Sequence, residues 1–118
     1  MMLPKVNTIS DLEIQINKKI IFKELLQQIN KDFQLIGIDY QFNSNIFFKD
    51  FFNQFEQIIK ELVDLNFQLF LNLLYRIDLN ESKIRAIIAT EKESVYARII
   101  FEILKREWQK VWFRHHYK

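Results

Sequence analysis

The sequence predicts a small all-α protein, a compact, bundle-like array of four to five helices. The chain has 118 residues with a single Gly (Gly37) and a single Pro (Pro4), whereas a β-rich fold needs frequent turns that usually contain these residues. Apolar residues recur at helical spacing along most of the chain. The length favours one domain over residues 1–118, and Pro4 makes residues 1–9 an irregular lead-in.

The first helix is expected from about Asp11 to Ile36. Ser10-Asp11-Leu12-Glu13 has the pattern of a capping box at its start. Gly37 stands where a left-handed C-terminal cap is wanted, with Ile38 as its apolar contact. Seven apolar residues share one face of this helix: Ile14, Ile21, Phe22, Leu25, Ile29, Phe33 and Ile36.

The segment 46–77 has the most regular apolar period, after a loop at 38–45. As one helix it would be about 48 Å long, which is long for a domain of this size. We therefore expect a break near Asp64-Leu65-Asn66, with Asn66 as a cap. A short helix then follows from Glu81 to about Ala89, capped by Asn80. Thr90-Glu91-Lys92-Glu93 is a second capping-box pattern and opens a last helix, from Glu91 to about Tyr117.

Composition excludes several classes of protein. The chain has no Cys, so it has no disulfide, no thiol nucleophile and no Cys-based zinc site. One Gly cannot form a glycine-rich phosphate loop. No segment reaches the roughly 18 uncharged apolar residues of a membrane span, and the N-terminus does not have the pattern of a signal peptide. We predict a cytoplasmic protein without a cofactor or a membrane span.

Enzymatic activity is the weakest of three hypotheses for the function. His115 and His116 are adjacent, so on a helix their rings point about 100° apart and cannot chelate one metal. They are expected to be solvent-facing tail residues. Most paired carboxylates lie in first turns of helices, where they complement the helix dipole. No set of nucleophile, base and orienting group is visible, so we predict no catalytic and no metal-binding residue.

Glu107 is the exception among the acidic residues. On a helical projection it lies only about 20° from the centre of the apolar face of the last helix. We expect it to be partly buried and to form a structural ion pair with Arg76, the basic residue that closes the apolar segment 67–77. Arg114, two turns further along, is the alternative partner. An exposed helix end and a polar contact in a binding interface stay open as alternatives.

The last helix has a second apolar flank, formed by Phe101, Trp108 and Trp112, so that half of its circumference is apolar. Either this helix is central in the bundle or it contacts a partner. The candidate interaction residues are Phe101, Lys105, Trp108, Lys110, Trp112 and Arg114. Trp and Arg are common in interface hot spots, so a homo-oligomer or a complex with a protein partner is expected.

Basic residues alternate with aromatic ones near the C-terminus, as in some proteins that bind nucleic acids. Residues 80–118 carry nine basic and five acidic side chains, and residues 1–79 carry eight and ten. However, the basic residues point in several directions, and cations late in a helix also complement its dipole. A small nucleic-acid-binding protein is therefore the alternative and not the favoured function.

Two stretches of the C-terminal half, Phe70-Leu71-Asn72-Leu73-Leu74-Tyr75-Arg76-Ile77-Asp78 and Lys105-Arg106-Glu107-Trp108-Gln109-Lys110-Val111-Trp112-Phe113-Arg114, resemble segments of small uncharacterised all-helical bacterial proteins. The resemblance implies no activity, and only that the two segments act together. The sequence thus favours a non-enzymatic helical interaction module that self-associates through its C-terminal helix.

Overall fold

The computed structural model describes residues 2–90 and 93–117, and this part of the chain forms six α-helices and no strand. The helices are α1 (Ile9–Ile16), α2 (Lys19–Ile36), α3 (Phe48–Leu65), α4 (Phe67–Ile77), α5 (Glu81–Thr90) and α6 (Val95–His116). The all-α class is confirmed, and the expected number of four to five helices is one too low. The additional helix arises because the first predicted helix is two.

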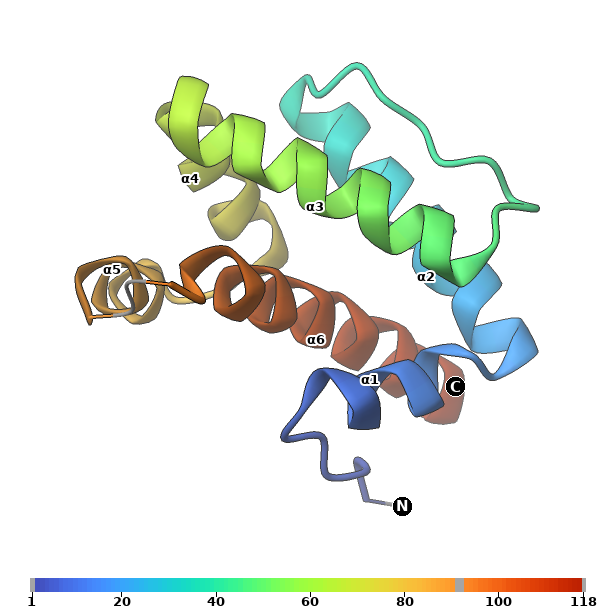
Figure 1. The fold of residues 1–118 in the computed structure, drawn as a ribbon. Helices are drawn as coiled ribbons and strands as arrows, with labels where there is room; N and C mark the ends of the chain where they lie inside the picture. Colours follow the sequence, from blue (N-terminus) through green and yellow to red (C-terminus); the bar gives the residue numbers. More distant parts are fainter. Residues whose placement is uncertain (1, 91–92, 118) are drawn as a thin grey trace.

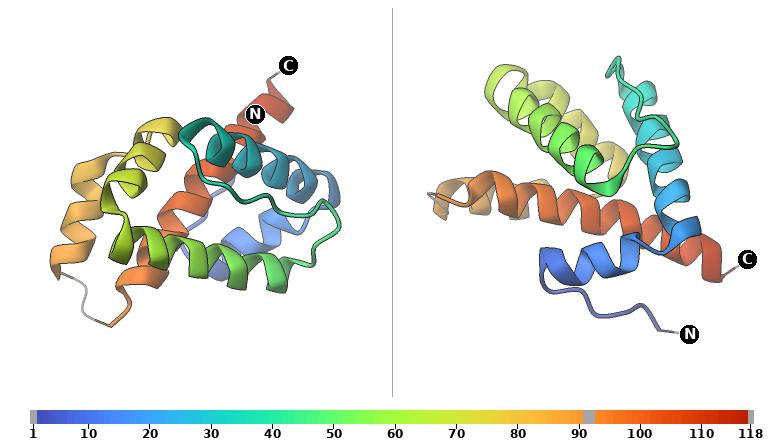
Figure 2. Two further views of the ribbon diagram at one scale, coloured as in Figure 1. Left: turned by 90° about the horizontal axis from the view of Figure 1, so that it is seen from above. Right: turned by 45° about the vertical axis from the view of Figure 1, so that its right-hand side comes forward.

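The array is built around α6, which packs against each of the other five helices. Figure 1 shows α6 running through the middle of the molecule, with α3 above it and α1 below it. The right-hand view of Figure 2 shows α2 and the α3–α4 pair on one side of α6, and α1 on the other. This central position explains why half the circumference of α6 is apolar.

The break between α1 and α2 lies at Asn17 and Lys18, and Lys18 has extended backbone angles. A continuous helix needs Ile14 on the buried face, but this side chain is 65% exposed, whereas Leu12 and Ile16 are fully buried. The break therefore shifts the buried face between the two helices. The expectation of one helix from Asp11 to Ile36 is wrong for this reason.

The start of the first helix also differs from the expectation. Thr8 is the N-cap of α1: its Oγ1 accepts from the backbone N–H of Asp11 at 3.1 Å, and the Asp11 carboxylate accepts from the N–H of Thr8 at 3.2 Å. The capping box is therefore Thr8–Asp11, two residues before the expected Ser10–Glu13. The hydrogen bond from the backbone of Asn7 is the main reason why the pKa of Asp11 is lowered.

Three helix ends follow the sequence closely. Gly37 ends α2 with φ 88°, and the N–H of Ile38 donates to the carbonyl of Phe33 at 2.9 Å. Asn66 separates α3 from α4, and its Oδ1 accepts from the N–H of Leu69 at 3.2 Å. Asn80 accepts from the N–H of Ser82 at 2.8 Å at the start of α5.

The other ends are shifted. The helix expected at the start of the segment 46–77 begins at Phe48, because the Asn43 side chain accepts from the N–H of Asn45 and holds a turn there. Thr90 ends α5, and its Oγ1 donates to the carbonyl of Ala86, so it does not start the last helix. That helix begins at Val95. Glu91 and Lys92, in the middle of the second predicted capping box, lie outside the described residues.

Candidate functional site

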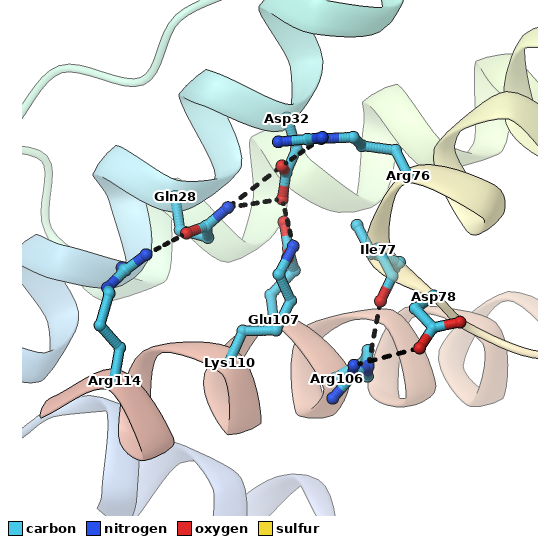
Figure 3. A network of polar contacts seen from close by, with 9 residues as sticks. All are labelled: Gln28, Asp32, Arg76, Ile77, Asp78, Arg106, Glu107, Lys110 and Arg114. Atoms are coloured by element: carbon cyan, nitrogen blue, oxygen red, sulfur yellow. Dashed lines mark hydrogen bonds and ion pairs between the residues drawn. The ribbon is translucent and has the colours of Figure 1, made fainter. Parts of the chain in front are cut away.

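A group of polar side chains lies in the interior where α2, α4 and α6 meet (Figure 3). At its centre are two acids, Asp32 from α2 and Glu107 from α6, whose exposed fractions are 0% and 1%. Buried carboxylates carry a large desolvation cost unless they are paired or neutralised. The surrounding side chains determine whether each acid is ionised and paired with cations, or protonated and neutral.

Asp32 receives four donors of the network. Arg76 Nε donates to Oδ1 at 2.9 Å, Lys110 Nζ donates to Oδ2 at 3.1 Å, and the Gln28 amide donates to both oxygens at 3.1 and 3.0 Å. Glu107 is the fourth donor. Burial alone would raise the pKa of Asp32, but hydrogen bonds from Glu107, Gln28 and Lys110 outweigh it and hold the pKa below its ordinary value. Asp32 is therefore the ionised member of the pair.

Glu107 is the protonated member. Burial is the largest cause, and the hydrogen bond to Asp32 and its negative charge add to it, so that the pKa of Glu107 is raised to about 8. Lys110 acts in the opposite direction, with its Nζ 3.4 Å from Glu107 Oε1. At neutral pH the Glu107 carboxyl donates its proton to the Asp32 carboxylate. One proton and one negative charge are thus shared between two acids.

The network continues to the surface at Arg114, and a separate group of contacts around Arg106 lies beside it. Arg114 donates to the Gln28 side-chain oxygen at 2.6 Å, so Gln28 connects it to Asp32. Arg106 donates to the carbonyl of Ile77 at 3.0 Å and lies 3.7 Å from the carboxylate of Asp78 (Figure 3). The contacts of Arg106 join the two segments singled out in the sequence, 70–78 and 105–114.

The structure pairs Arg76 and Glu107 with other residues, whereas the prediction paired them with each other. Glu107 is buried, as expected, but the Arg76 guanidinium pairs with Asp32, and the cation beside Glu107 is Lys110. Arg76 and Glu107 both contact Asp32, which the sequence analysis did not single out. A signal was present, because Gln28 and Asp32 stand between Leu25 and Ile36 at the spacing of a buried stripe.

The three aromatic candidates for interaction belong to the core. Trp108 is fully buried, and Trp112 and Phe101 are 5% and 7% exposed. The three basic candidates all have intramolecular contacts. Lys110 and Arg114 belong to the buried network, and Lys105 lies over the ring of Phe101, with Nζ 5.6 Å from its centroid.

A cluster of exposed and half-buried apolar side chains lies beside the N-terminal ends of α2 and α3, which are neighbours in Figure 1. Phe47 is 79% exposed, and Phe22, Ile46, Phe48 and Phe52 next to it are half-buried. The rings of Phe22 and Phe48 lie 5.9 Å apart, and those of Phe48 and Phe52 lie 6.2 Å apart. We call these five residues the aromatic patch. Four of them line a hollow of about 530 Å³.

None of the described helices is long and apolar enough to cross a membrane. Across residues 2–90 and 93–117, no three His, Asp or Glu side chains gather in a way that could hold a metal ion. The chain matches no protein-family model, no curated protein and no solved structure.

Proposed function

We propose that this protein is a non-enzymatic helical interaction module that self-associates through the aromatic patch. The observation that carries the proposal is Phe47. This side chain is 79% exposed, and it is absent from the apolar residues that pack on the core. Aromatic side chains bury a large apolar area at interfaces, and a group of them around a hollow is typical of a contact surface.

The charges around the aromatic patch favour a second copy of the chain as the partner. Lys23 borders the hollow, and Lys49 and Asp50 follow Phe48 in the exposed first turn of α3. In a symmetric dimer the same surface is used by both subunits, so it must be complementary to itself. A border with charges of both signs allows each lysine to face an acid of the other subunit.

The buried network supports a structural role for the polar residues of α6. Its acids are closed to solvent, and its cations are directed at these acids or at backbone and side-chain oxygens. We infer that this buried network fixes one arrangement of the three helices that contribute to it. It holds α2, α4 and α6 in register, and the aromatic patch is formed on that frame.

The nucleic-acid alternative has less support. A binder should present its cations together on one face, but Arg106, Lys110 and Arg114 are engaged within the chain. Arg98 and Lys83 both lie next to Glu102, at 3.8 and 3.0 Å. Lys118 lies outside the described residues.

The test is the oligomeric state of the protein and of two matched variants. Sedimentation of the parent chain should show a dimer or larger species at high micromolar concentration. Phe47→Ser should shift this equilibrium towards the monomer by about tenfold or more in the dissociation constant, because central aromatic side chains dominate interfaces. Leu65→Ser is the control, since Leu65 is as exposed, at 83%, but lies at the other end of α3. A monomeric parent chain, or equal effects of the two variants, would refute the proposal.

A further inference from the structure

The aromatic patch contains both a protruding ring and a hollow. Phe47 is 79% exposed at the start of α3, so its ring stands out from the surface and does not fill the hollow of about 530 Å³ that it helps to line. Phe22 and Phe48 form apolar walls of the same hollow. A cavity of roughly 150 Å³ is large enough to bind benzene, so the hollow has room for a phenyl ring.

The ring and the hollow are adjacent parts of one surface. In a symmetric dimer both subunits use the same surface, so a two-fold axis that passes between the two features brings the ring of each subunit to the hollow of the other. If the two Phe47 rings instead stacked on each other across the axis, both hollows would stay empty. The exchange therefore buries more apolar area than stacking does.

The charges next to the ring and next to the hollow have opposite signs. Asp50 lies in the first turn of α3, three residues after the N-cap Phe47, and side chains with this spacing lie on the same side of a helix start. Lys23 lines the hollow, and both charged side chains are exposed. Lys49, one residue before Asp50, projects about 100° away from it around the helix. A ring that enters the hollow of the partner thus brings Asp50 towards the partner's Lys23.

We infer that the two subunits exchange rings: Phe47 of each enters the hollow of the other, and Asp50 pairs with Lys23 across the interface. The inserted ring contacts the partner's Phe22 and Phe48, and the ion pair occurs twice in each dimer. This contact rests on the self-association proposed for the chain, and it determines which parts of the two patches meet.

The first test mixes two variants that are each defective on one side of the contact. Phe47→Ser removes the ring and keeps the hollow. Ser44→Trp keeps the ring and fills the hollow, because Ser44 is an exposed residue that lines it. Each variant alone should dimerise about tenfold or more weaker than the parent chain. In the mixed dimer one ring still enters one open hollow, so native mass spectrometry should show more mixed dimer than random pairing gives.

The second test exchanges charges and leaves the packing of the rings unchanged. Lys23→Glu alone makes acids face acids in the dimer, and Asp50→Lys alone makes bases face bases, so each should dimerise several-fold more weakly at low salt. A mixture of the two restores opposite charges at both pairs and should again favour the mixed dimer, less so as salt is added. Lys31→Glu is the control for Lys23→Glu, because Lys31 is an exposed lysine of α2 that does not line the hollow. Mixed with Asp50→Lys, it should pair at random.

The two tests separate the exchange of rings from self-association itself. Circular dichroism of each variant first establishes that it has the fold of the parent chain. If the parent chain is a dimer and either mixture of folded variants pairs only at random, the subunits meet through the patch without exchanging rings, and the inference is wrong while the proposed function holds. A monomeric parent chain removes both.

Discussion

Glu107 and Asp32 show what one helical projection can predict and what it misses. The projection of α6 identified Glu107 as an acid inside an apolar stripe, and the side chain is buried. The partner could not be predicted, because it depends on which turn of α2 faces α6. Asp32 has the polar neighbours Asn30 and Lys31 in the sequence, and these conceal its place on the buried stripe.

Glu107 should make the stability of the protein depend on pH. Its pKa is about 8 in the folded protein against an ordinary value of 4.5. Between these values the native state holds a proton that the unfolded state has lost, so the free energy of unfolding falls as the pH rises. The slope from this group is at most about 1.4 kcal/mol per pH unit. Below about 4.5 and above about 8 the group contributes no further slope.

The variant Glu107→Gln isolates this effect. Its amide N–H₂ replaces the carboxyl O–H as donor to Asp32, but it does not titrate. Urea unfolding between about pH 5 and pH 8 should therefore show the variant gaining stability relative to the parent chain as the pH rises. Other titrating groups cancel in the comparison. Parallel pH profiles of the two proteins would show that Glu107 does not hold the extra proton.

Asp32 is expected to be the more important acid for stability. Asp32→Asn removes the buried anion that accepts from Arg76, Lys110 and Gln28, and the expected loss is about 2–4 kcal/mol in the free energy of unfolding. Asp39→Asn removes the same charge at an exposed position and should change stability by less than about 0.5 kcal/mol. Similar losses in the two variants, measured by urea unfolding, would contradict a central role for Asp32.

Helix ends were predicted well where a local feature determines them. Gly37 and Asn66 act through their own backbone angles or side chains, which do not depend on distant residues. The break at Asn17 depends on tertiary packing, whereas the start at Thr8 depends on a choice between two local caps. Both Thr8 and Ser10 are residues that can cap a helix, and Thr8 is the one that does so, with Asp11 as its partner. The sequence 11–36 has no Gly or Pro to mark the break.

Gly37→Ala tests the cap of α2. A Cβ at this position meets no atom within 4 Å, so the cost arises from the backbone alone, because φ is 88°. We expect a loss of about 1 kcal/mol in the free energy of unfolding. Gly37→Asn should recover part of this loss, because Asn tolerates left-handed angles better than Ala. If Ala and Asn are equivalent in thermal unfolding, the left-handed cap does not determine stability here.

The central position of α6 is a property of the whole molecule. Its second apolar flank allowed two interpretations, a central helix or a partner surface, and both require the same residues. Only the positions of α1–α5 around it distinguish them, and these positions bury Phe101, Trp108 and Trp112 within one chain. The most exposed aromatic side chain of the described residues is instead Phe47, at the start of α3.

Self-association should also appear in the thermal stability. A dimer formed only by folded chains stabilises the native state by mass action, so the unfolding midpoint of the parent chain should rise with protein concentration. Phe47 is the N-cap of α3 and makes no side-chain capping bond. Ser is a favourable N-cap, so Phe47→Ser should stabilise the monomer by about 1 kcal/mol while it weakens the dimer.

Plots of the unfolding midpoint against protein concentration for Phe47→Ser and for the parent chain are therefore expected to cross. At low micromolar concentration Phe47→Ser should unfold at a higher temperature than the parent chain. At high concentration the parent chain should gain stability that the variant lacks. Leu65→Ser should keep the slope of the parent chain. If the midpoint of the parent chain does not change over a hundredfold range of concentration, the aromatic patch is exposed without a second copy to cover it.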